Sequence, residues 1–98
     1  MGSEDVIRQN REVLDGITQS LVRLIAQRDK AVLKIGKAKN ELGIKIIDAS
    51  RERKLLEKGR RLAKRHNVNP ETVARILKIL IKHSRYMQAM KKRNLSAK

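Results

Sequence analysis

Apolar residues recur every three or four positions between Glu4 and Leu42, a stretch of thirty-nine residues that contains no proline. The apolar seam consists of Leu14, Ile17, Leu21, Leu24, Ala31, Ile35, Ala38 and Leu42. This spacing predicts a helix over residues 4–42 that packs along one face, in the manner of a coiled coil. Such a helix is roughly 58 Å long, whereas a compact chain of this length has a radius of gyration of about 13 Å. We therefore expect it to project beyond its own chain and to pack against another.

A second helix is predicted over residues 49–65. Gly43 is placed to end the first helix, and Asp48 is suited to cap the next one because its carboxylate can accept hydrogen bonds from free backbone amides. The predicted inward face consists of Leu55, Leu56, Leu62 and Ala63. Gly59 weakens this helix by roughly 1 kcal/mol relative to alanine. Close contact with another helix is the only explanation that the pattern offers for this glycine.

A third helix is predicted over residues 70–90, with Asn69 as its N-cap and Pro70 in its first turn. Residues 91–98 are polar and basic and are expected to form a frayed tail. Phenylalanine and tryptophan are absent and the chain has one tyrosine, which suits helices packed through aliphatic side chains. The expected fold is therefore all-α, with three helices in a single domain over residues 1–98.

The chain is strongly basic, and the charge is unevenly distributed. Twenty-five Lys and Arg residues against ten Asp and Glu residues give a net charge of +15. Residues 1–47 carry nine basic and six acidic groups, net +3, whereas residues 48–98 carry sixteen and four, net +12. This excess favours anionic partners and admits a basic helical nucleic-acid-binding protein. Binding of single strands usually uses stacking aromatic residues, however, and Tyr86 is the only one present, so nucleic acid is the weaker alternative.

Several other classes of protein are excluded by composition. Without cysteine the chain has neither disulfides nor thiolate metal sites. His66 and His83 are seventeen residues apart with no local ligand pattern, so no metal site is predicted. The N-terminus lacks the apolar run of a secretory signal, and no run approaches the roughly 18 residues of a membrane span. A cytoplasmic protein is the expectation.

Polar residues interrupt each predicted apolar face. Arg28 and Lys39 are eleven residues apart and share one face of the first helix at about 100° per residue. Taken singly, each polar residue on these faces has an ordinary explanation. The cations can extend to solvent or pair with acids, and the uncharged or acidic residues can cap or flank a helix end. Polar groups on three faces together predict a small cavity, since burying so many without a ligand is costly. The residues concerned are Arg28, Lys39, Asp48, Arg51, Glu52, Ser84 and Gln88.

The positive charge of this predicted cavity suits a small dianion, because guanidinium groups match carboxylates with paired hydrogen bonds. The chain offers no cysteine nucleophile, no serine placed beside a histidine and an acid, and no glycine-rich phosphate loop. The expected chemistry therefore rests on binding, orientation and electrostatics.

Five segments resemble the all-helical class of chorismate mutases between residues 7 and 88. They are Arg11 with Leu14 and Ile17; residues 24–28; residues 35–39; residues 48–53; and Ile81 through Ser84 to Gln88. The resemblance implies an intertwined homodimer with shared active sites. It also implies the intramolecular Claisen rearrangement of chorismate to prephenate, on the route to phenylalanine and tyrosine, a reaction that needs no cofactor. The departures are Thr18, where the family often has aspartate, Gly16 within the long helix, and the basic tail.

The resemblance assigns the substrate carboxylates to cationic residues. It implies that Arg28, Lys39 and Arg51 bind them locally, that Ser84 assists, and that Arg11 of the partner subunit completes each site. Helical geometry agrees about Arg11, which lies seventeen residues before Arg28 and about 100° around the helix. The two arginines should therefore not serve the same site within one chain.

Lys39 and Gln88 are implied by the same resemblance to donate hydrogen bonds to the ether oxygen, and Glu52 with the Asp48 region to hold the ring hydroxyl group. An isochorismate pyruvate lyase, similar in fold and in its cationic pocket, is the nearest alternative. Such lyases tend to lack the pair formed by Arg51 and Glu52 after an aspartate, so the mutase is favoured. Docking onto another enzyme of the pathway is left open by the sequence.

Overall fold

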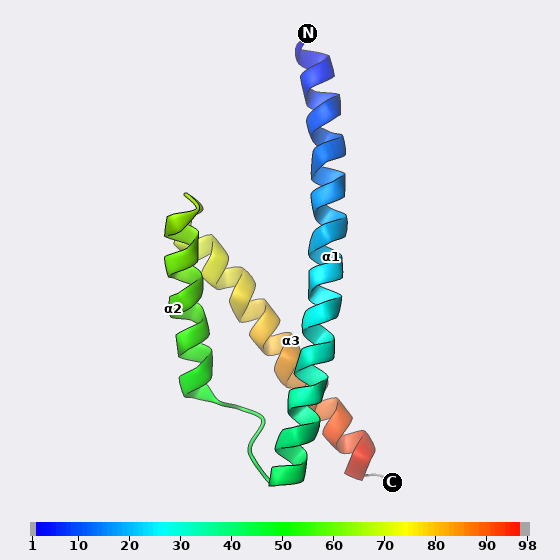
Figure 1. Ribbon diagram of the computed structural model, residues 1–98, viewed down its shortest axis with the longest axis vertical. Helices are drawn as coiled ribbons and strands as arrows, with labels where there is room; N and C mark the ends of the chain where they lie inside the picture. Colours follow the sequence, from blue (N-terminus) through cyan, green and yellow to red (C-terminus); the bar gives the residue numbers. More distant parts are fainter. Residues whose placement is uncertain (1, 97–98) are drawn as a thin grey trace. The chain divides into compact units, whose positions relative to one another are not determined.

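Three helices make up the computed structural model, which describes residues 2–96 (Figure 1). They are α1 (Ser3–Leu42), α2 (Ala49–Arg65) and α3 (Pro70–Ser96), with no strand among the described residues. The predicted all-α class, with three helices and a very long first one, is confirmed. Within residues 2–96, no helix combines the length and the apolar character needed to cross a membrane. The chain divides into two compact units, Met1–Ala31 and Val32–Lys98.

The first unit is the part of α1 that ends at Ala31. Its apolar seam is exposed: Leu14, Leu21 and Leu24 have exposed fractions of 59%, 54% and 57%. A single helix has no second surface of its own against which such a seam can be buried, and most helical stability comes from packing an apolar face. The seam of this unit is therefore an apolar surface that is open to solvent in the single chain.

In the second unit, α2 and α3 run in opposite directions and are joined by a turn at residues 66–69 (Figure 1). Asn67 adopts a left-handed conformation with φ of 57°, and the Val68 amide donates a 2.8 Å hydrogen bond to the Ala63 carbonyl, which closes the end of α2. The Asn69 Oδ1 atom accepts hydrogen bonds of 2.9 and 3.0 Å from the amides two and three residues further on. The predicted N-cap of α3 is thereby confirmed.

Small residues allow α2 and α3 to approach each other closely. Gly59 and Ala63 of α2 and Ala74 of α3 are buried. A Cβ atom added at Gly59 would overlap the Leu77 Cδ1 atom and lie 3.5 Å from the Val73 Cγ1 atom. Close helix contact therefore accounts for the glycine in the middle of α2.

Replacing Gly59 by alanine is expected to destabilise the protein by about 1 kcal/mol. The overlap with Leu77 costs about 1–3 kcal/mol, whereas the better helix propensity returns only about 1 kcal/mol. Gly16→Ala is the matched control, because a Cβ atom there meets nothing within 4 Å. Urea unfolding at one fixed chain concentration measures both variants. A Gly59→Ala chain as stable as Gly16→Ala would show that Leu77 moves aside without cost.

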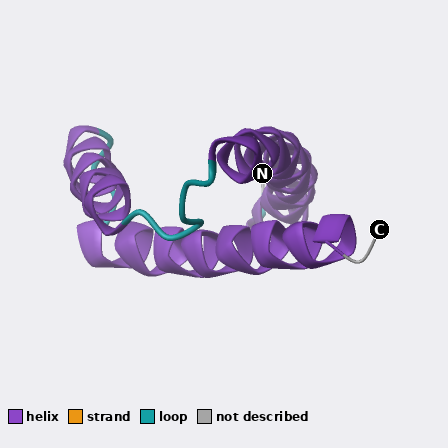
Figure 2. Cartoon of the chain, turned by 90° about the horizontal axis from the view of Figure 1, so that it is seen from below, coloured by secondary structure: helices purple, strands orange, loops and turns teal. Residues whose placement is uncertain are grey.

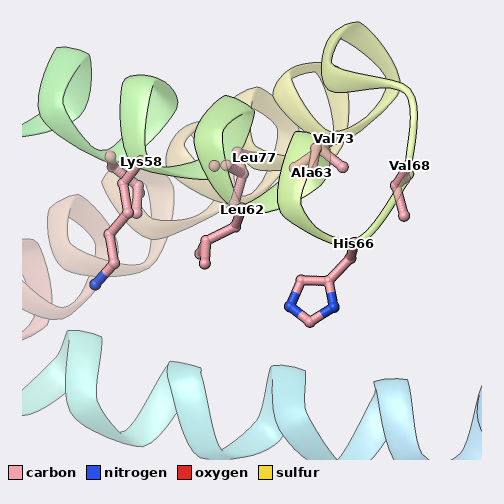
Figure 3. A pocket seen from close by; sticks show the side chains of 9 residues that line it. Lys58, Leu62, Ala63, His66, Val68, Val73 and Leu77 are labelled. Atoms are coloured by element: carbon pink, nitrogen blue, oxygen red, sulfur yellow. The ribbon is translucent and has the colours of Figure 1, made fainter.

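An apolar groove of about 430 Å³ lies along the contact between α2 and α3. Figure 3 shows Lys58 and Leu62 of α2, and His66 just after its end, pointing to the same side of this groove. Leu62 is 38% exposed, although its position in the sequence predicts an inward-facing residue. Helices α2 and α3 thus leave an apolar surface open along their contact.

The last part of α1, which belongs to the second unit, crosses α3 (Figures 1 and 2). Val32 and Gln88 are both buried there, each with an exposed fraction of 8%. A Cβ atom added at Gly36 would lie only 2.9 Å from the Gln88 Cγ atom, so the glycine leaves room for the glutamine side chain. This crossing fixes the position of Gln88 against α1.

The predicted end of the third helix at residue 90 is wrong, because α3 continues to Ser96. Lysine and arginine at positions 91–93 are good helix formers, and cations are favourable near the negative end of a helix dipole. Polarity suggested a frayed tail, but neither glycine nor proline is present there to end the helix. Residues 97–98 of the predicted tail lie outside the described part of the chain.

Candidate active site

Lys39 lies in the last turn of α1, close to the predicted helix end. Gly43 has φ of 67°, and the Ile44 amide donates a 2.8 Å hydrogen bond back to the Lys39 carbonyl, so the chain turns sharply there. The following connector passes the half-buried Lys39 side chain, whose Nζ donates a 3.0 Å hydrogen bond to the Ile46 carbonyl. An ammonium group has three N–H donors, so this contact leaves donors for an anionic ligand.

The start of α2 brings three predicted site residues into one turn. Asp48 is the N-cap, and its Oδ1 accepts a 3.0 Å hydrogen bond from the Arg51 backbone N–H. This confirms the capping role predicted from the sequence. The Arg51 side chain is exposed, whereas Glu52 in the same turn is half-buried. The two neighbours therefore meet different surroundings.

Glu52 forms an ion pair with Arg85 of α3. The Arg85 Nε atom donates a 2.8 Å hydrogen bond to Glu52 Oε2, and Arg85 Nη2 makes a second contact with Glu52 Oε1. The pKa of Glu52 lies below its ordinary value, chiefly because of the hydrogen bond from Arg85. The charges of Arg85 and Lys39 also lower this pKa, whereas burial and the charge of Asp48 raise it. These four residues, Lys39, Asp48, Glu52 and Arg85, are called the charge cluster below. Within it Glu52 is a carboxylate at neutral pH.

Arg85 is a member of this cluster that the sequence interpretation missed. It lies four residues after Ile81 and eight after Leu77, so it continues the row of α3 that contacts α2. Glu52 lies two turns before Gly59, and Gly59 contacts Leu77. Because the helices run in opposite directions, the neighbour of Glu52 lies two turns after Leu77 on α3, which is the position of Arg85. The signal that could have identified Arg85 is a cation that extends the apolar row of α3.

Ser84 and Gln88 lie one turn apart on α3, as their spacing predicts. Gln88 is buried, and its Nε2 donates a 2.9 Å hydrogen bond to the Val32 carbonyl of α1. Ser84 is half-buried, and its Oγ donates a 2.8 Å hydrogen bond to the Leu80 carbonyl within the helix. A primary amide has two N–H donors, so Gln88 can bond to Val32 and to a ligand.

Arg11 and Arg28 both lie in the first unit, on the continuous helix α1. Arg28 is half-buried and Arg11 is exposed. Seventeen residues of helix separate them by about 25 Å along the axis, which is much longer than a small dianion. The structure therefore does not bring these two arginines to one place within a chain.

The chemistry available to the second unit is that of donors and charges. Within residues 2–96, no three His, Asp or Glu side chains gather closely enough to hold a metal ion. An ammonium group, a fixed carboxylate and a buried amide can bind an anion, orient a hydroxyl group and stabilise negative charge as it develops. The fold and these groups together define a small helical protein with a candidate ligand site built from hydrogen-bond donors and paired charges.

Comparison with known sequences identifies the family. Residues 10–89 match the family described as chorismate mutase type II, so the match spans most of the chain. The chain therefore belongs to this family of chorismate mutases. The family resemblance inferred from the five sequence segments is confirmed.

Three relatives illustrate the extent of the similarity. A chorismate mutase of Methanocaldococcus jannaschii is 36% identical over 78 residues, which covers 80% of this chain and 79% of that protein. Bifunctional chorismate mutase/prephenate dehydratases of Buchnera aphidicola subsp. Schizaphis graminum and Escherichia coli K12 are 33% and 31% identical over 84 residues. These matches cover 86% of this chain but only 22% of each bifunctional protein. The match thus spans most of the first relative and about a fifth of each of the other two.

Proposed function

We propose that this chain is an isomerase that converts chorismate to prephenate, with residues 1–98 acting as one chorismate mutase domain. The observation that carries the proposal is the family match over residues 10–89, supported by a similar chorismate mutase of which the match covers 79%. The reaction involves one substrate and no group transfer to the protein. It therefore needs what the site offers, namely orientation and stabilisation of developing charge.

The proposed catalytic donors are Lys39 and Gln88. As the C–O bond of the substrate breaks, negative charge develops on the ether oxygen, and preorganised N–H donors stabilise that charge more than they stabilise the ground state. The hydrogen bonds of Lys39 to Ile46 and of Gln88 to Val32 support this role, because they fix both side chains before substrate binds. Each group retains a further donor for the oxygen.

The remaining predicted residues bind and orient the substrate in this proposal. Arg28 and Arg51 bind its carboxylates together with Lys39, Ser84 assists, and Arg11 of the partner subunit completes the set. Glu52, with the Asp48 region beside it, accepts the hydrogen bond of the ring hydroxyl group. The lowered pKa of Glu52, caused chiefly by the hydrogen bond from Arg85, supports an acceptor role because an ionised carboxylate has only acceptor sites.

The test of the proposed function is loss of chorismate absorbance on addition of the purified chain, with the product identified. Prephenate is the expected product. Pyruvate and salicylate, formed from isochorismate, would instead identify the lyase alternative, and absence of turnover with either substrate would overturn both.

A cytoplasmic location remains a prediction, which a fluorescent fusion in the source cell would check.

A homodimer is proposed because two apolar surfaces need a cover: the seam of α1 and the groove along α2 and α3. Sedimentation equilibrium should give twice the mass of one chain at micromolar concentration. Leu21→Lys should weaken association because it places a charge in the seam, whereas Gln19→Lys, about 200° away on the same helix, should not. A folded, stable monomer of the unaltered chain would remove the basis for shared active sites.

A further inference from the structure

Arg85 holds the Glu52 carboxylate at two points. Its Nε and Nη2 atoms contact the two different carboxylate oxygens, which is the paired geometry that gives an arginine control over orientation as well as charge. The Glu52 side chain is 20% exposed and that of Arg85 43% exposed, so the acceptor is the better shielded partner. Rotation of the Glu52 carboxylate therefore requires both contacts to break.

The backbone of α3 is fixed at the right distance for this pair. Leu77, two turns before Arg85, packs against Gly59, two turns after Glu52, where no Cβ atom fits. Close packing at that point sets the register of α2 against α3. Arg85 consequently approaches Glu52 from a rigid element and not from a mobile loop.

Lys39 is the cation that would compete for Glu52. The Lys39 Nζ atom bonds to the Ile46 carbonyl, two residues before the Asp48 cap of the turn that carries Glu52. After Arg85, the charge of Lys39 also lowers the pKa of Glu52. A Glu52 carboxylate released from Arg85 would be drawn towards the Lys39 ammonium group. That pairing would neutralise the cation that the proposed function assigns to the substrate.

We propose that Arg85 is a positioning residue that keeps Glu52 oriented and away from Lys39, so that Lys39 stays available to the anionic substrate. The inference rests on the proposed function. Two of the roughly four lone-pair sites of the carboxylate are taken by Arg85, and the others accept the hydroxyl group of the substrate. Arg85 thus acts on the reaction through its two neighbours and needs no contact with the substrate.

The test begins with steady-state kinetics of Arg85→Gln across pH. KM for chorismate should rise on the order of tenfold, with a smaller fall in kcat, because Lys39 is diverted from binding. Arg85 lowers the pKa of Glu52, so its removal raises that pKa. Activity that requires the carboxylate is then lost at higher pH than in the unaltered enzyme as the solution is acidified. Arg85→Lys, which keeps the charge but not the fork, should recover part of the loss.

Lys82→Gln is the matched control, because Lys82 is an exposed cation that lines the same shallow groove of α3 and α2 as Arg85. It removes the same charge from the same surface and should leave KM and the pH profile unchanged. Thermal unfolding of each variant separates a loss of fold from a loss of substrate binding. An Arg85→Gln chain that differs from Lys82→Gln only in melting temperature would overturn the inference while leaving the proposed function intact.

A double variant provides an independent outcome. Glu52→Gln alone should lower activity, because the carboxylate acceptor is lost, whereas the same change in an Arg85→Gln chain should lower KM, because it releases Lys39. The two effects are therefore strongly non-additive. Additive losses would overturn the positioning role. An unaltered chain that consumes no chorismate would overturn the proposed function itself, a result that no comparison among the variants can mimic.

Discussion

An equal mixture of Arg11→Ala and Arg28→Ala chains, refolded together, should recover about one quarter of the activity of the unaltered enzyme, although each variant alone is nearly inactive. Half of the dimers in such a mixture are heterodimers, and in each heterodimer one of the two sites receives both intact arginines. The expected recovery follows from the proposal that Arg11 serves the site of the partner subunit while Arg28 serves its own.

The geometry of α1 is the reason for this expectation. Arg11 and Arg28 are separated by about 25 Å of continuous helix, so one small dianion cannot bridge them within a chain. A second copy whose α1 runs alongside in the opposite direction can bring its Arg11 to the Arg28 of the first. Removal of an arginine that binds a carboxylate in a shielded site typically costs 2–5 kcal/mol, about 30-fold or more in affinity.

The matched control is a mixture of Arg11→Ala with an Arg11→Ala, Arg28→Ala double variant, in which no dimer has an intact site. Activity per chain is measured at a chorismate concentration below the KM of the unaltered enzyme, after refolding and again without refolding, since exchange of chains requires dissociation. Recovery in the control mixture would reveal contamination. No recovery in the complementing mixture, at a measured heterodimer fraction near one half, would show that Arg11 does not serve the site of the partner subunit.

Local rules of sequence predicted most of the fold. Asp48 and Asn69 cap α2 and α3 as their side chains predict, and Gly43 ends α1 with a positive φ. Each of these outcomes depends on a few neighbouring atoms, and they are therefore encoded locally. The predicted end of α3 was wrong because it rested on the polarity of the basic residues 91–93. Lysine and arginine are good helix formers, whereas glycine and proline are the residues that end a helix.

Pairing over a distance was harder to predict. The contact of Glu52 with Arg85 depends on the register of α2 against α3, which the contact of Gly59 with Leu77 sets two turns away along each helix. Neither the local sequence nor the charge pattern specifies that register. The sequence did identify Gly59 as unusual, but it did not say which residue of α3 lies opposite. Once that contact is known, helical geometry leads directly to Arg85.

Gln88→Glu should turn the enzyme into one that works only at low pH. A neutral amide donates a hydrogen bond at any pH, whereas a carboxyl group donates only while it is protonated. As the new carboxyl group ionises, the ether oxygen loses a donor and gains a repulsive negative charge, so kcat should fall by about 10² or more. The unaltered enzyme should show no such decline, because the Gln88 amide does not titrate and Glu52, with its lowered pKa, stays ionised.

The buried position of Gln88 makes a second effect of this substitution predictable. Gln88 Nε2 donates to the Val32 carbonyl, so an ionised carboxylate would also face that carbonyl oxygen and destabilise the crossing of α1 and α3, by about 1–3 kcal/mol. The new carboxyl group should therefore have a raised pKa in the folded state, and the stability lost by the variant should appear as pH rises through that value. Melting temperatures at each pH quantify this structural part.

Measurements of kcat and KM from about pH 4.5 to 8 then separate the two effects. Gln19→Glu is the matched control, because it makes the same chemical change at an exposed position of α1 and should follow the unaltered enzyme throughout. A fall in kcat at temperatures well below melting, where the variant remains folded by circular dichroism, would place the Gln88 amide at the breaking bond. A pH profile of kcat parallel to that of Gln19→Glu, with only the melting temperature changed, would mean that Gln88 joins α3 to α1 through Val32 and takes no part in the reaction.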